Sequence, residues 1–388
     1  MSIGLLIIGI VLFIGLIVVH EWGHFVAARR GGVEVEEFGI FFPPRLFSHR
    51  TKKGWRFTIN LIPLGGFVKL KGEHDLDTEP GSFGASSIWV KTKIMAAGVV
   101  MNLIVGLILL TIIAWLGMPQ LVPNQFSIKS DTKTTRSEVL AVAIQPDSPA
   151  QKAGLKNDDQ LVKIGLPGHL EAITSDEGLS ALAKKYAGQK VDLIYYDQGR
   201  QHISFVKLNS QQVVTASLKT NNQKYYLGVQ LGSYTLKRST WSAPIVAVGL
   251  TAQLSALTYQ GVGHALGGLG SIIAGTVTGN SKARTNGQSA ASSQVAGPVG
   301  IFAVMQDGSL LGYQFMLMII AIISLTLALM NILPIPALDG GRLWITLIAH
   351  ALKKPLSAKK EEAINAAGFV VLMALIVVVT IVDIHRFY

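Results

Sequence analysis

Two histidines and a glutamate near the amino terminus form a pattern that can bind a metal ion. Residues 20–24 read HEWGH, which matches the pattern HExxH. On a helix, His20 and His24 share one face, where two imidazole nitrogens can bind one Zn²⁺ ion. Glu21 lies next to that face, and its carboxylate can take a proton from water and later hand it to a leaving amine. At the end of an apolar helix, where such residues are costly, the pattern predicts a zinc site for hydrolysis of a peptide bond. The alternative is a set of interfacial polar residues that reach toward the lipid headgroups.

A catalytic zinc site needs a third ligand from elsewhere in the chain, because such sites usually have three protein ligands and one open position. The chain has no Cys, so this ligand is a His, an Asp or a Glu. Residues 331–342 read NILPIPALDGGR, and their two prolines break the preceding apolar helix. Freed backbone is tolerated at membrane depth only where it is buried in protein or lines a wet cavity. Asp339 projects from this segment; the alternative is an ordinary helix stop and turn.

The composition indicates a membrane protein. Apolar residues make up 49% and charged residues 15% of the 388, and the mean hydropathy is +0.43, which is too apolar for an ordinary soluble enzyme. A helix needs roughly 20 residues to cross a bilayer. Four segments are long and apolar enough: Ile3–Val19, Ile94–Leu116, Leu310–Ile332 and Ala366–Val382. The first lacks the basic start and the cleavage site of a signal peptide, so we expect a retained helix.

Basic residues between the expected spans indicate the topology. The loops at 25–93 and 334–365 carry many Lys and Arg residues, which favours the cytoplasmic side. Four spans with these loops inside place both termini and the segment 118–309 outside. The first and third spans then end at the same membrane face, as a metal site shared between them requires. Basic flanks of this kind account for the net charge of +11 better than nucleic-acid binding does.

We expect four regions along the chain. They are an amino-terminal membrane region with the HExxH helix and a cytoplasmic hairpin loop at 1–117, an extracytoplasmic α+β domain at 118–240, a Gly-rich membrane-associated segment with a polar loop at 241–309, and a carboxyl-terminal membrane region at 310–388. Short alternating runs at 191–195 and 202–206 favour strands in the second region. The Gly-rich part of the third lies on the membrane surface or enters it partway. The polar loop at 279–294 is assigned no role.

Part of the second region resembles the peptide-binding face of a PDZ domain. The resemblance rests on PDSPAQKAGL at 146–155 and DDQLV at 158–162. A PDZ-like module would capture extended peptides by adding them as a strand to a sheet edge. The alternative is a generic turn and helix cap.

Taken together, the sequence resembles the site-2 protease family of intramembrane zinc metalloproteases, and most closely the bacterial regulator-of-sigma-E protease type. HEWGH, NILPIPALDGG, the four spans and the PDZ-like domain carry the resemblance, which covers nearly the whole chain. It implies that His20, His24 and Asp339 bind Zn²⁺ and that Glu21 is the catalytic acid and base. It also implies that Asn331 helps to hold the substrate or its developing oxyanion.

A short hairpin strand is the expected contact with the substrate. Gly65, Gly66, Phe67, Val68 and Lys69 resemble the membrane-dipping hairpin that pairs with the substrate in this family. A physical reason supports the same role, because a transmembrane helix must be opened before a metal ion can reach its carbonyl groups. An edge strand offers replacement hydrogen bonds to the opened segment. The alternative is a cytoplasmic hairpin without substrate contact.

The resemblance implies a multi-pass protein of the cell inner or plasma membrane, with its active site toward the cytoplasm. Its expected partners are the lipid bilayer, peptide termini at the PDZ-like domain, and single-pass proteins already shortened by another protease, such as anti-sigma factors or remnant signal peptides. Two departures are a single PDZ-like domain, where some relatives have two, and the long polar loop. Residues 297–300, GPVG, match a further signature of the family.

Two other functions stay open. The first is a membrane-anchored PDZ scaffold that binds peptides without cutting them, for which Glu21 is dispensable. The second is a metal transporter, motivated by His and Asp residues within apolar segments. Transport requires polar residues at the midplane of several spans, and the second and fourth spans have almost none beyond Asn102 and Thr380.

Overall fold

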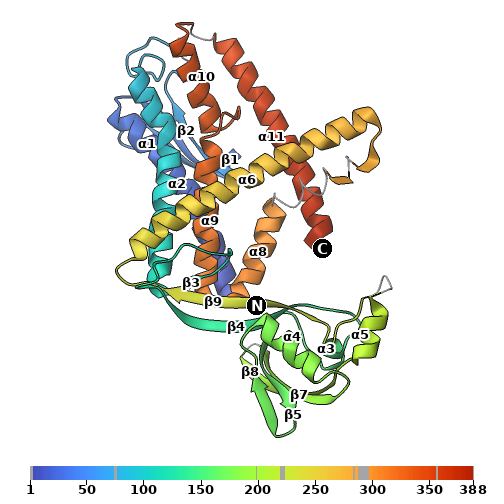
Figure 1. The fold of residues 1–388 in the computed structure, drawn as a ribbon. Coiled ribbons are helices and arrows are strands. Elements are labelled where there is room, and N and C mark those ends of the chain that lie inside the picture. Colours follow the sequence, from blue (N-terminus) through green and yellow to red (C-terminus); the bar gives the residue numbers. More distant parts are fainter. Residues whose placement is uncertain are drawn as a thin grey trace. The chain divides into compact units, whose positions relative to one another are not determined.

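The computed structural model has two compact units, each described by itself. One unit comprises Met1–Ile113 with Ala243–Tyr388, and the other comprises Ala114–Ser242 (Figure 1). The residues that the structure describes are 3–73, 77–197, 199–218, 223–282, 285–286, 297–354 and 357–387. Most of the expected polar loop at 279–294 lies outside them.

The first unit is built from long apolar helices. Among the described residues, five helices are long and apolar enough to cross a membrane: α1 (Ile3–Arg30), α2 (Ile88–Leu116), α6 (Ala243–Thr278), α9 (Tyr313–Asn331) and α11 (Ala358–Phe387). Four of them overlap the expected spans, and α6 forms from the Gly-rich segment. The prediction of a multi-pass helical membrane protein with an inserted β domain is confirmed. A count of four crossing helices stays a prediction.

One expected span begins at a different residue. The sequence predicts a continuous helix from Leu310, whereas Leu310 lies in the last turn of α8 (Pro298–Leu311) and α9 begins at Tyr313. Gly312 separates the two helices with a φ of 102°, a conformation that side chains with a Cβ rarely adopt. Hydropathy alone does not detect this break, because both helices are apolar.

Small residues let the helices of this unit approach one another closely. A Cβ atom on Gly23 of α1 would lie 2.7 Å from the carbonyl oxygen of Ala97 on α2, and one on Gly9 would lie 2.5 Å from the sulfur of Met316 on α9. Lipid tails are as apolar as Leu side chains, so close van der Waals packing is a main force that associates such helices. These contacts fix the inner part of α1 against α2 and α9.

A buried carboxylate fixes the start of α8. Asp383 of α11 accepts hydrogen bonds from the backbone N–H groups of Gly297 and Gly300, both at 2.8 Å. Two of the unpaired amides at the amino end of a helix are satisfied in this way, next to the positive end of its dipole. The GPVG signature therefore has a structural role as the capped first turn of α8.

A small sheet follows α1 in the chain. It consists of β1 (Val35–Arg50) and β2 (Arg56–Leu70), and the first half of β1 pairs with both halves of β2, as Gly39 pairs with Phe67 and with Thr58. The second half of β1 pairs with the first half of β2. Phe38 packs against Phe25 of α1, with ring centroids 5.7 Å apart, and holds the sheet beside the helix.

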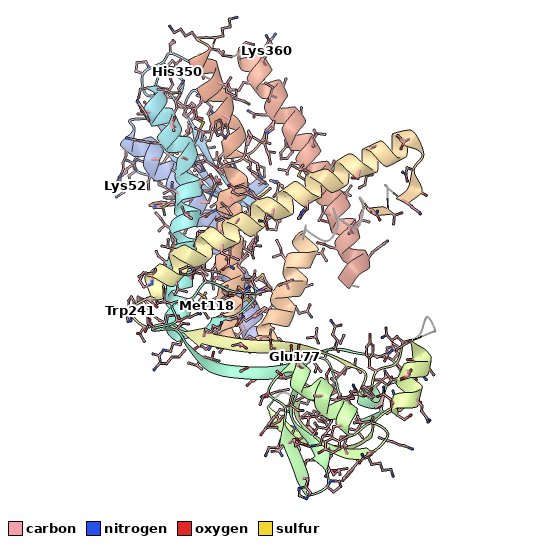
Figure 2. The ribbon with its side chains drawn as sticks, viewed as in Figure 1. Lys52, Met118, Glu177, Trp241, His350 and Lys360 are labelled. Atoms are coloured by element: carbon pink, nitrogen blue, oxygen red, sulfur yellow. The ribbon has the colours of Figure 1, made fainter. Side chains whose placement is uncertain are left out.

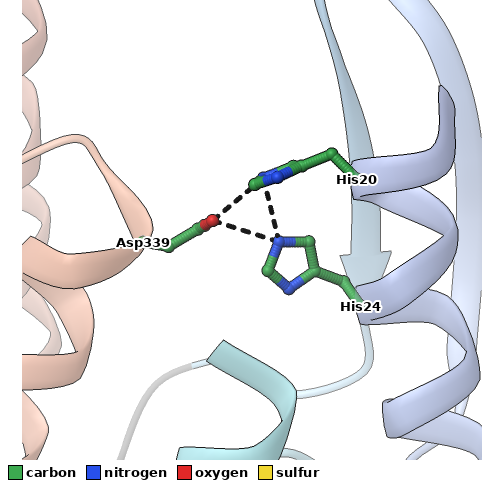
Figure 3. A group of neighbouring side chains, drawn as sticks. All are labelled: His20, His24 and Asp339. Carbon is green, nitrogen blue, oxygen red and sulfur yellow. Dashed lines mark hydrogen bonds and ion pairs between the residues drawn. The ribbon is translucent and has the colours of Figure 1, made fainter. Parts of the chain in front are cut away.

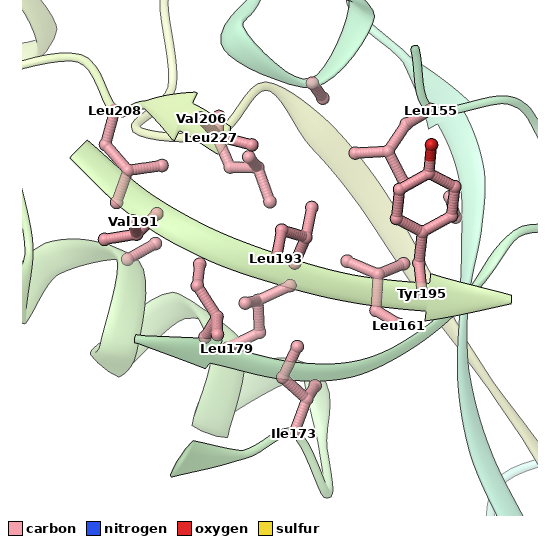
Figure 4. Close-up of a cluster of buried hydrophobic side chains, with 14 of the residues drawn as sticks. Leu155, Leu161, Ile173, Leu179, Val191, Leu193, Tyr195, Val206, Leu208 and Leu227 are labelled. Atoms are coloured by element: carbon pink, nitrogen blue, oxygen red, sulfur yellow. The ribbon is translucent and has the colours of Figure 1, made fainter. Parts of the chain in front are cut away.

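In its described residues, the second unit is an antiparallel sheet with three short helices. The strand order is β3-β9-β4-β5-β7-β8, and β6 pairs with β5. The elements are β3 (Met118–Pro119), β4 (Lys133–Ile144), α3 (Pro149–Lys152), β5 (Gln160–Leu166), β6 (His169–Ala172), α4 (Asp176–Lys185), β7 (Lys190–Asp197), β8 (Arg200–Lys207), α5 (Gln211–Ser217) and β9 (Val229–Arg238). Figure 4 shows its core, to which alternate residues of β7 contribute Val191, Leu193 and Tyr195. The alternation that predicted a strand in this region is confirmed.

The segment that resembles a PDZ face forms a turn and a short helix. Ser148 caps α3 by accepting a hydrogen bond from the backbone N–H of Gln151 at 3.2 Å. Ala150 and Leu155 then enter the core of the unit. This local structure is equally the one expected of a generic turn and helix cap.

Candidate metal centre

The two histidines of the HExxH pattern lie on one face of a continuous helix. α1 runs without a break from Ile3 to Arg30, so the pattern lies well inside it. The Nε2 atoms of His20 and His24 are 3.2 Å apart. Their side chains are 12% and 11% exposed, so both imidazoles lie in a largely dry environment. The helical spacing predicted from the sequence is present.

A tight loop between α9 and α10 (Asp339–Ala351) presents the aspartate. The backbone N–H of Ile335 donates to the carbonyl oxygen of Leu333 at 2.7 Å, and α10 begins at Asp339. A Cβ atom on Gly340 would lie 2.3 Å from the oxygen of Leu333, and one on Gly341 would lie 2.2 Å from that of Ile335. Only glycine at these two positions lets the loop fold back on the start of α10, so the DGG sequence has a steric reason.

The aspartate and the two histidines meet at one point (Figure 3). The Oδ2 atom of Asp339 lies 3.0 Å from Nε2 of His20 and 3.1 Å from Nε2 of His24. Zinc–ligand bonds of about 2.0–2.1 Å in a tetrahedral site place the ligand atoms roughly 3.3 Å apart. The triangle formed by these three atoms therefore fits a Zn²⁺ ion that keeps a fourth position open. Among the described residues, these three form the one group of His, Asp or Glu side chains whose ligand atoms are close enough to hold a metal ion.

Hydrogen bonds orient both imidazoles for metal binding. The Nδ1 atom of His24 lies 2.8 Å from the carbonyl oxygen of Ile94, which requires a proton on Nδ1 and leaves the lone pair of Nε2 free. The Nδ1 atom of His20 lies 3.1 Å from Nδ2 of Asn102 on α2. Oδ1 of Asn102 is buried without a partner in the part of the chain that the structure describes. Rotation of the Asn102 side-chain amide by 180° exchanges its oxygen and nitrogen and brings Oδ1 to Nδ1 of His20. Oδ1 then accepts a proton from Nδ1, and His20 has the tautomer in which Nε2 is free to bind a metal.

Asn102 is thus a functional candidate that the sequence reasoning did not assign. Its signal was present as a single amide within a long apolar span. Its backbone carbonyl also accepts a hydrogen bond from the hydroxyl of Ser324 at 2.7 Å, which ties α2 to α9.

Gly98 of α2 lies directly against both imidazoles. A Cβ atom there would lie 2.4 Å from Nε2 of His24 and 2.5 Å from Cε1 of His20. Both distances are far below van der Waals contact, and the two rings are held by the hydrogen bonds described above. The metal centre therefore requires glycine at this position.

Gly98→Ala is expected to abolish stoichiometric zinc binding while the helices stay folded. The added methyl group displaces one imidazole, so only two of the three ligand atoms can still reach one ion. Zinc content of the purified protein, measured beside circular dichroism, checks this result. Gly15→Ala is the matched control, because no atom lies within 4 Å of its added Cβ. Equal zinc content in both variants contradicts the steric argument.

Glu21 lies between the metal centre and β2. Its carboxylate is within electrostatic range of His20, His24 and Asp339. A Cβ atom on Gly66 would lie 2.8 Å from Cγ of Glu21, so the backbone of β2 passes directly against this side chain. The structure thus brings the expected base and part of the expected hairpin to the metal centre.

The other expected substrate residues are placed less directly. Asn331 is the last residue of α9, at the start of the loop that carries the aspartate. The ring of Phe67 stacks on Phe42 at 6.5 Å, Val68 packs on a buried cluster, and Lys69 pairs with Glu36 at 2.7 Å. Gly65 lies against the ring of Phe42, because a Cβ atom on Gly65 would lie 3.0 Å from two of the ring carbons. Because these side chains already have contacts, a role for this strand rests on its backbone.

A metal centre with HExxH on a membrane helix and a distant aspartate on a second helix is typical of a membrane-embedded zinc peptidase. Comparison with known proteins agrees. The chain belongs to peptidase family M50, the site-2 protease family, whose model matches residues 8–375. The prediction made from the sequence motifs is confirmed.

Three relatives extend along the whole chain. A candidate zinc metalloprotease of Clostridium perfringens is 30% identical over 98% of both chains. The zinc metalloprotease RasP of Oceanobacillus iheyensis is 27% identical over 98% of this chain and 99% of its own. A protein of Enterococcus faecalis described as the probable protease Eep is 25% identical over 98% of both chains. The chain is therefore a zinc metalloprotease, and Zn²⁺ is its cofactor.

Proposed function

We propose that this protein hydrolyses peptide bonds in or near the transmembrane segments of single-pass proteins, with Zn²⁺ held by His20, His24 and Asp339. The observation that carries the proposal is the meeting of these three donor atoms on membrane helices, within 3.2 Å of one another. Such polar groups are costly in or near lipid and mark functional sites. A substrate that reaches this point is itself within the membrane or at its edge.

The residues around the centre support a general acid and base mechanism. When bound, zinc polarises the scissile carbonyl and makes a water molecule acidic enough to act as a nucleophile near neutral pH. Glu21 accepts the proton of the attacking water and returns it to the leaving nitrogen. The carbonyl of Ile94, and the amide oxygen of Asn102 once turned toward Nδ1, favour the tautomers whose Nε2 lone pairs face the metal. Asn331 is proposed to hold the carbonyl oxygen as negative charge develops on it.

The edge of β2 is proposed to hold the opened substrate as an added strand. The backbone N–H of Lys71 donates to the carbonyl oxygen of Glu34, the residue directly before β1, so it points toward β1. The backbone N–H of Leu70 donates instead to the side chain of Glu73. Alternate amides of a strand point to opposite edges, so the N–H of Val68 faces away from β1, as does that of Gly66 beside Glu21. This open edge provides donors for a substrate backbone next to the proposed base.

Val68→Pro is expected to lower cleavage about five- to tenfold, because it removes one outward hydrogen-bond donor whose bond contributes roughly 1–1.5 kcal/mol. Zinc content is expected to be unchanged. The measurement is the initial cleavage rate of a transmembrane reporter in proteoliposomes. Val68→Ala is the control, since it loses the same packing but keeps the amide. Similar rates for the two variants would argue against strand addition.

We also propose that the unit of Ala114–Ser242 is a PDZ-like module on the extracytoplasmic side, together with both termini. β9 pairs with β4 along its length but with β3 only at Leu236 and Lys237. In the described chain its outer edge is otherwise free of a strand, which supports capture of an extended peptide there. Pre-shortened single-pass proteins that expose a new terminus fit such a module. Binding of labelled terminal peptides to the purified full chain, with internal peptides as controls, tests this role.

Removal of the metal is the direct test of the proposed function. Proteoliposomes that contain the protein are expected to cleave a single-pass reporter, to stop when a chelator removes zinc, and to resume when zinc is restored. The chemistry depends on a metal that these three side chains bind reversibly. A soluble peptide of the same sequence serves as the comparison substrate. A reporter that is bound but never cut in the zinc-loaded protein favours the peptide-binding scaffold instead.

A further inference from the structure

A cavity rich in basic side chains lies between the carboxyl end of α1 and the small sheet of β1 and β2. Its volume is about 960 Å³, and seven Lys or Arg side chains but three Glu side chains line it. It shares no residue with the metal centre. Lys52, labelled in Figure 2, marks the turn between β1 and β2 at this sheet. The cavity therefore has a positive charge that the catalytic proposal does not use.

The three carboxylates of the cavity are already neutralised by other lining residues. The ion pairs are Glu34 with Lys71 at 3.5 Å, Glu36 with Lys69 at 2.7 Å, and Glu37 with Arg45 at 2.7 Å. Glu37 is buried, and its second oxygen accepts a hydrogen bond from the hydroxyl of Thr58 at 2.8 Å. These carboxylates are thus not available to the remaining cations.

Four cations of the lining lack a carboxylate partner. Arg29, Arg50, Lys53 and Arg56 form no ion pair with any residue that the structure describes. Arg50 and Arg56 are direct partners across the hairpin that β1 and β2 form. Like charges in directly opposite positions destabilise a strand pair. An anion between the two strands removes this repulsion.

The position of the cavity favours an anion that belongs to the membrane surface. Arg29 lies in the last turn of α1, a helix long and apolar enough to cross the bilayer. Two turns of helix earlier, Trp22 is 47% exposed and stacks on Phe25, and Trp is enriched where membrane meets water. The cytoplasmic flanks of membrane-spanning substrates are themselves basic, so this cavity repels them.

We infer that the cavity binds a phosphate group, with Arg50 and Arg56 as its principal ligands. The planar guanidinium matches phosphate oxygens in pairs, and Arg29 and Lys53 add charge from the helix end and the turn. Anionic phospholipid headgroups at the surface are one source of this phosphate, and a free phosphate compound is the other. Lipid bound here anchors the sheet whose other end passes against Glu21.

The test is the thermal unfolding midpoint of the full-length protein in mixed micelles, as phosphatidylglycerol replaces phosphatidylcholine. A parallel titration uses inorganic phosphate without phosphatidylglycerol. The variant is Arg50→Gln with Arg56→Gln, and the control is Lys359→Gln with Lys360→Gln, two exposed cations at the start of α11. The control changes the net charge by the same amount. Neither pair belongs to the metal centre, and the readout does not depend on proteolysis.

In wild type and control, phosphatidylglycerol is expected to raise the midpoint at the same mole fraction. The arginine variant should need roughly thirtyfold more, since it loses two phosphate ligands that contribute about 1 kcal/mol each. In phosphatidylcholine alone it should unfold at the same or a higher temperature than wild type, because its like-charge pair is gone. A wild-type response to inorganic phosphate that the variant lacks identifies a free compound as the source. The inference fails if the wild-type midpoint moves with neither probe, or if both double variants lose the response equally.

Discussion

Glu21→Gln is expected to lower the cleavage rate of a transmembrane reporter by roughly 10²–10⁴-fold while zinc binding persists. Glutamine has nearly the same shape, so the close contact between this side chain and Gly66 of β2 is kept. It cannot accept the proton of the attacking water, however, and the acid and base step is lost. The measurement is single-turnover cleavage in proteoliposomes, together with the zinc content of the same preparation.

Two results separate the roles of Glu21. Loss of cleavage with full zinc content supports a catalytic proton carrier, whereas loss of both indicates that this residue supports the site structurally. Glu177→Gln, an exposed carboxylate on α4, is the control for a charge change without a role in catalysis. If Glu21→Gln cuts as fast as wild type, the proposed mechanism is wrong and the scaffold function becomes the better explanation.

Asp339→Ala is expected to remove zinc and to reduce cleavage below detection. Its Oδ2 atom is within 3.1 Å of both imidazole Nε2 atoms, so the variant leaves two ligands where a catalytic site needs three. The loss of zinc affinity should exceed the roughly 10–100-fold effect of removing an outer hydrogen-bond partner. Equilibrium zinc binding in a competing chelator gives this value directly.

Asn102→Ala provides the comparison for this prediction. It leaves all three proposed ligands in place and removes only the amide next to Nδ1 of His20. A ranking in which Asp339→Ala loses more zinc affinity than Asn102→Ala supports direct ligation by the aspartate. The reverse ranking, or retention of zinc by Asp339→Ala, shows that the third ligand is a different residue.

Local sequence determined the elements that carry the chemistry. HExxH on an apolar segment places two imidazoles on one face because the helical repeat depends only on spacing. The length and hydropathy of the apolar segments predicted membrane helices, because roughly 20 apolar helical residues span a bilayer. Alternation of apolar and polar residues predicted the strand around Val191–Tyr195. The hairpin strand at Gly65–Lys69 is also present. Each of these features depends on neighbours within a few residues.

Tertiary structure decided how these elements meet. Asp339 is 315 positions from His24 in the chain. Its approach depends on Gly340 and Gly341, where a Cβ atom would lie within 2.3 Å of a backbone oxygen of the preceding loop. Gly98 and Asn102 of α2 have no local pattern that assigns them to the metal centre, because their partners are on another helix. The break at Gly312, the double pairing of β1 and the unpaired arginines of the basic cavity depend likewise on long-range packing. Spacing along one helix predicts which side chains share a face, whereas only the folded chain decides what lies opposite that face.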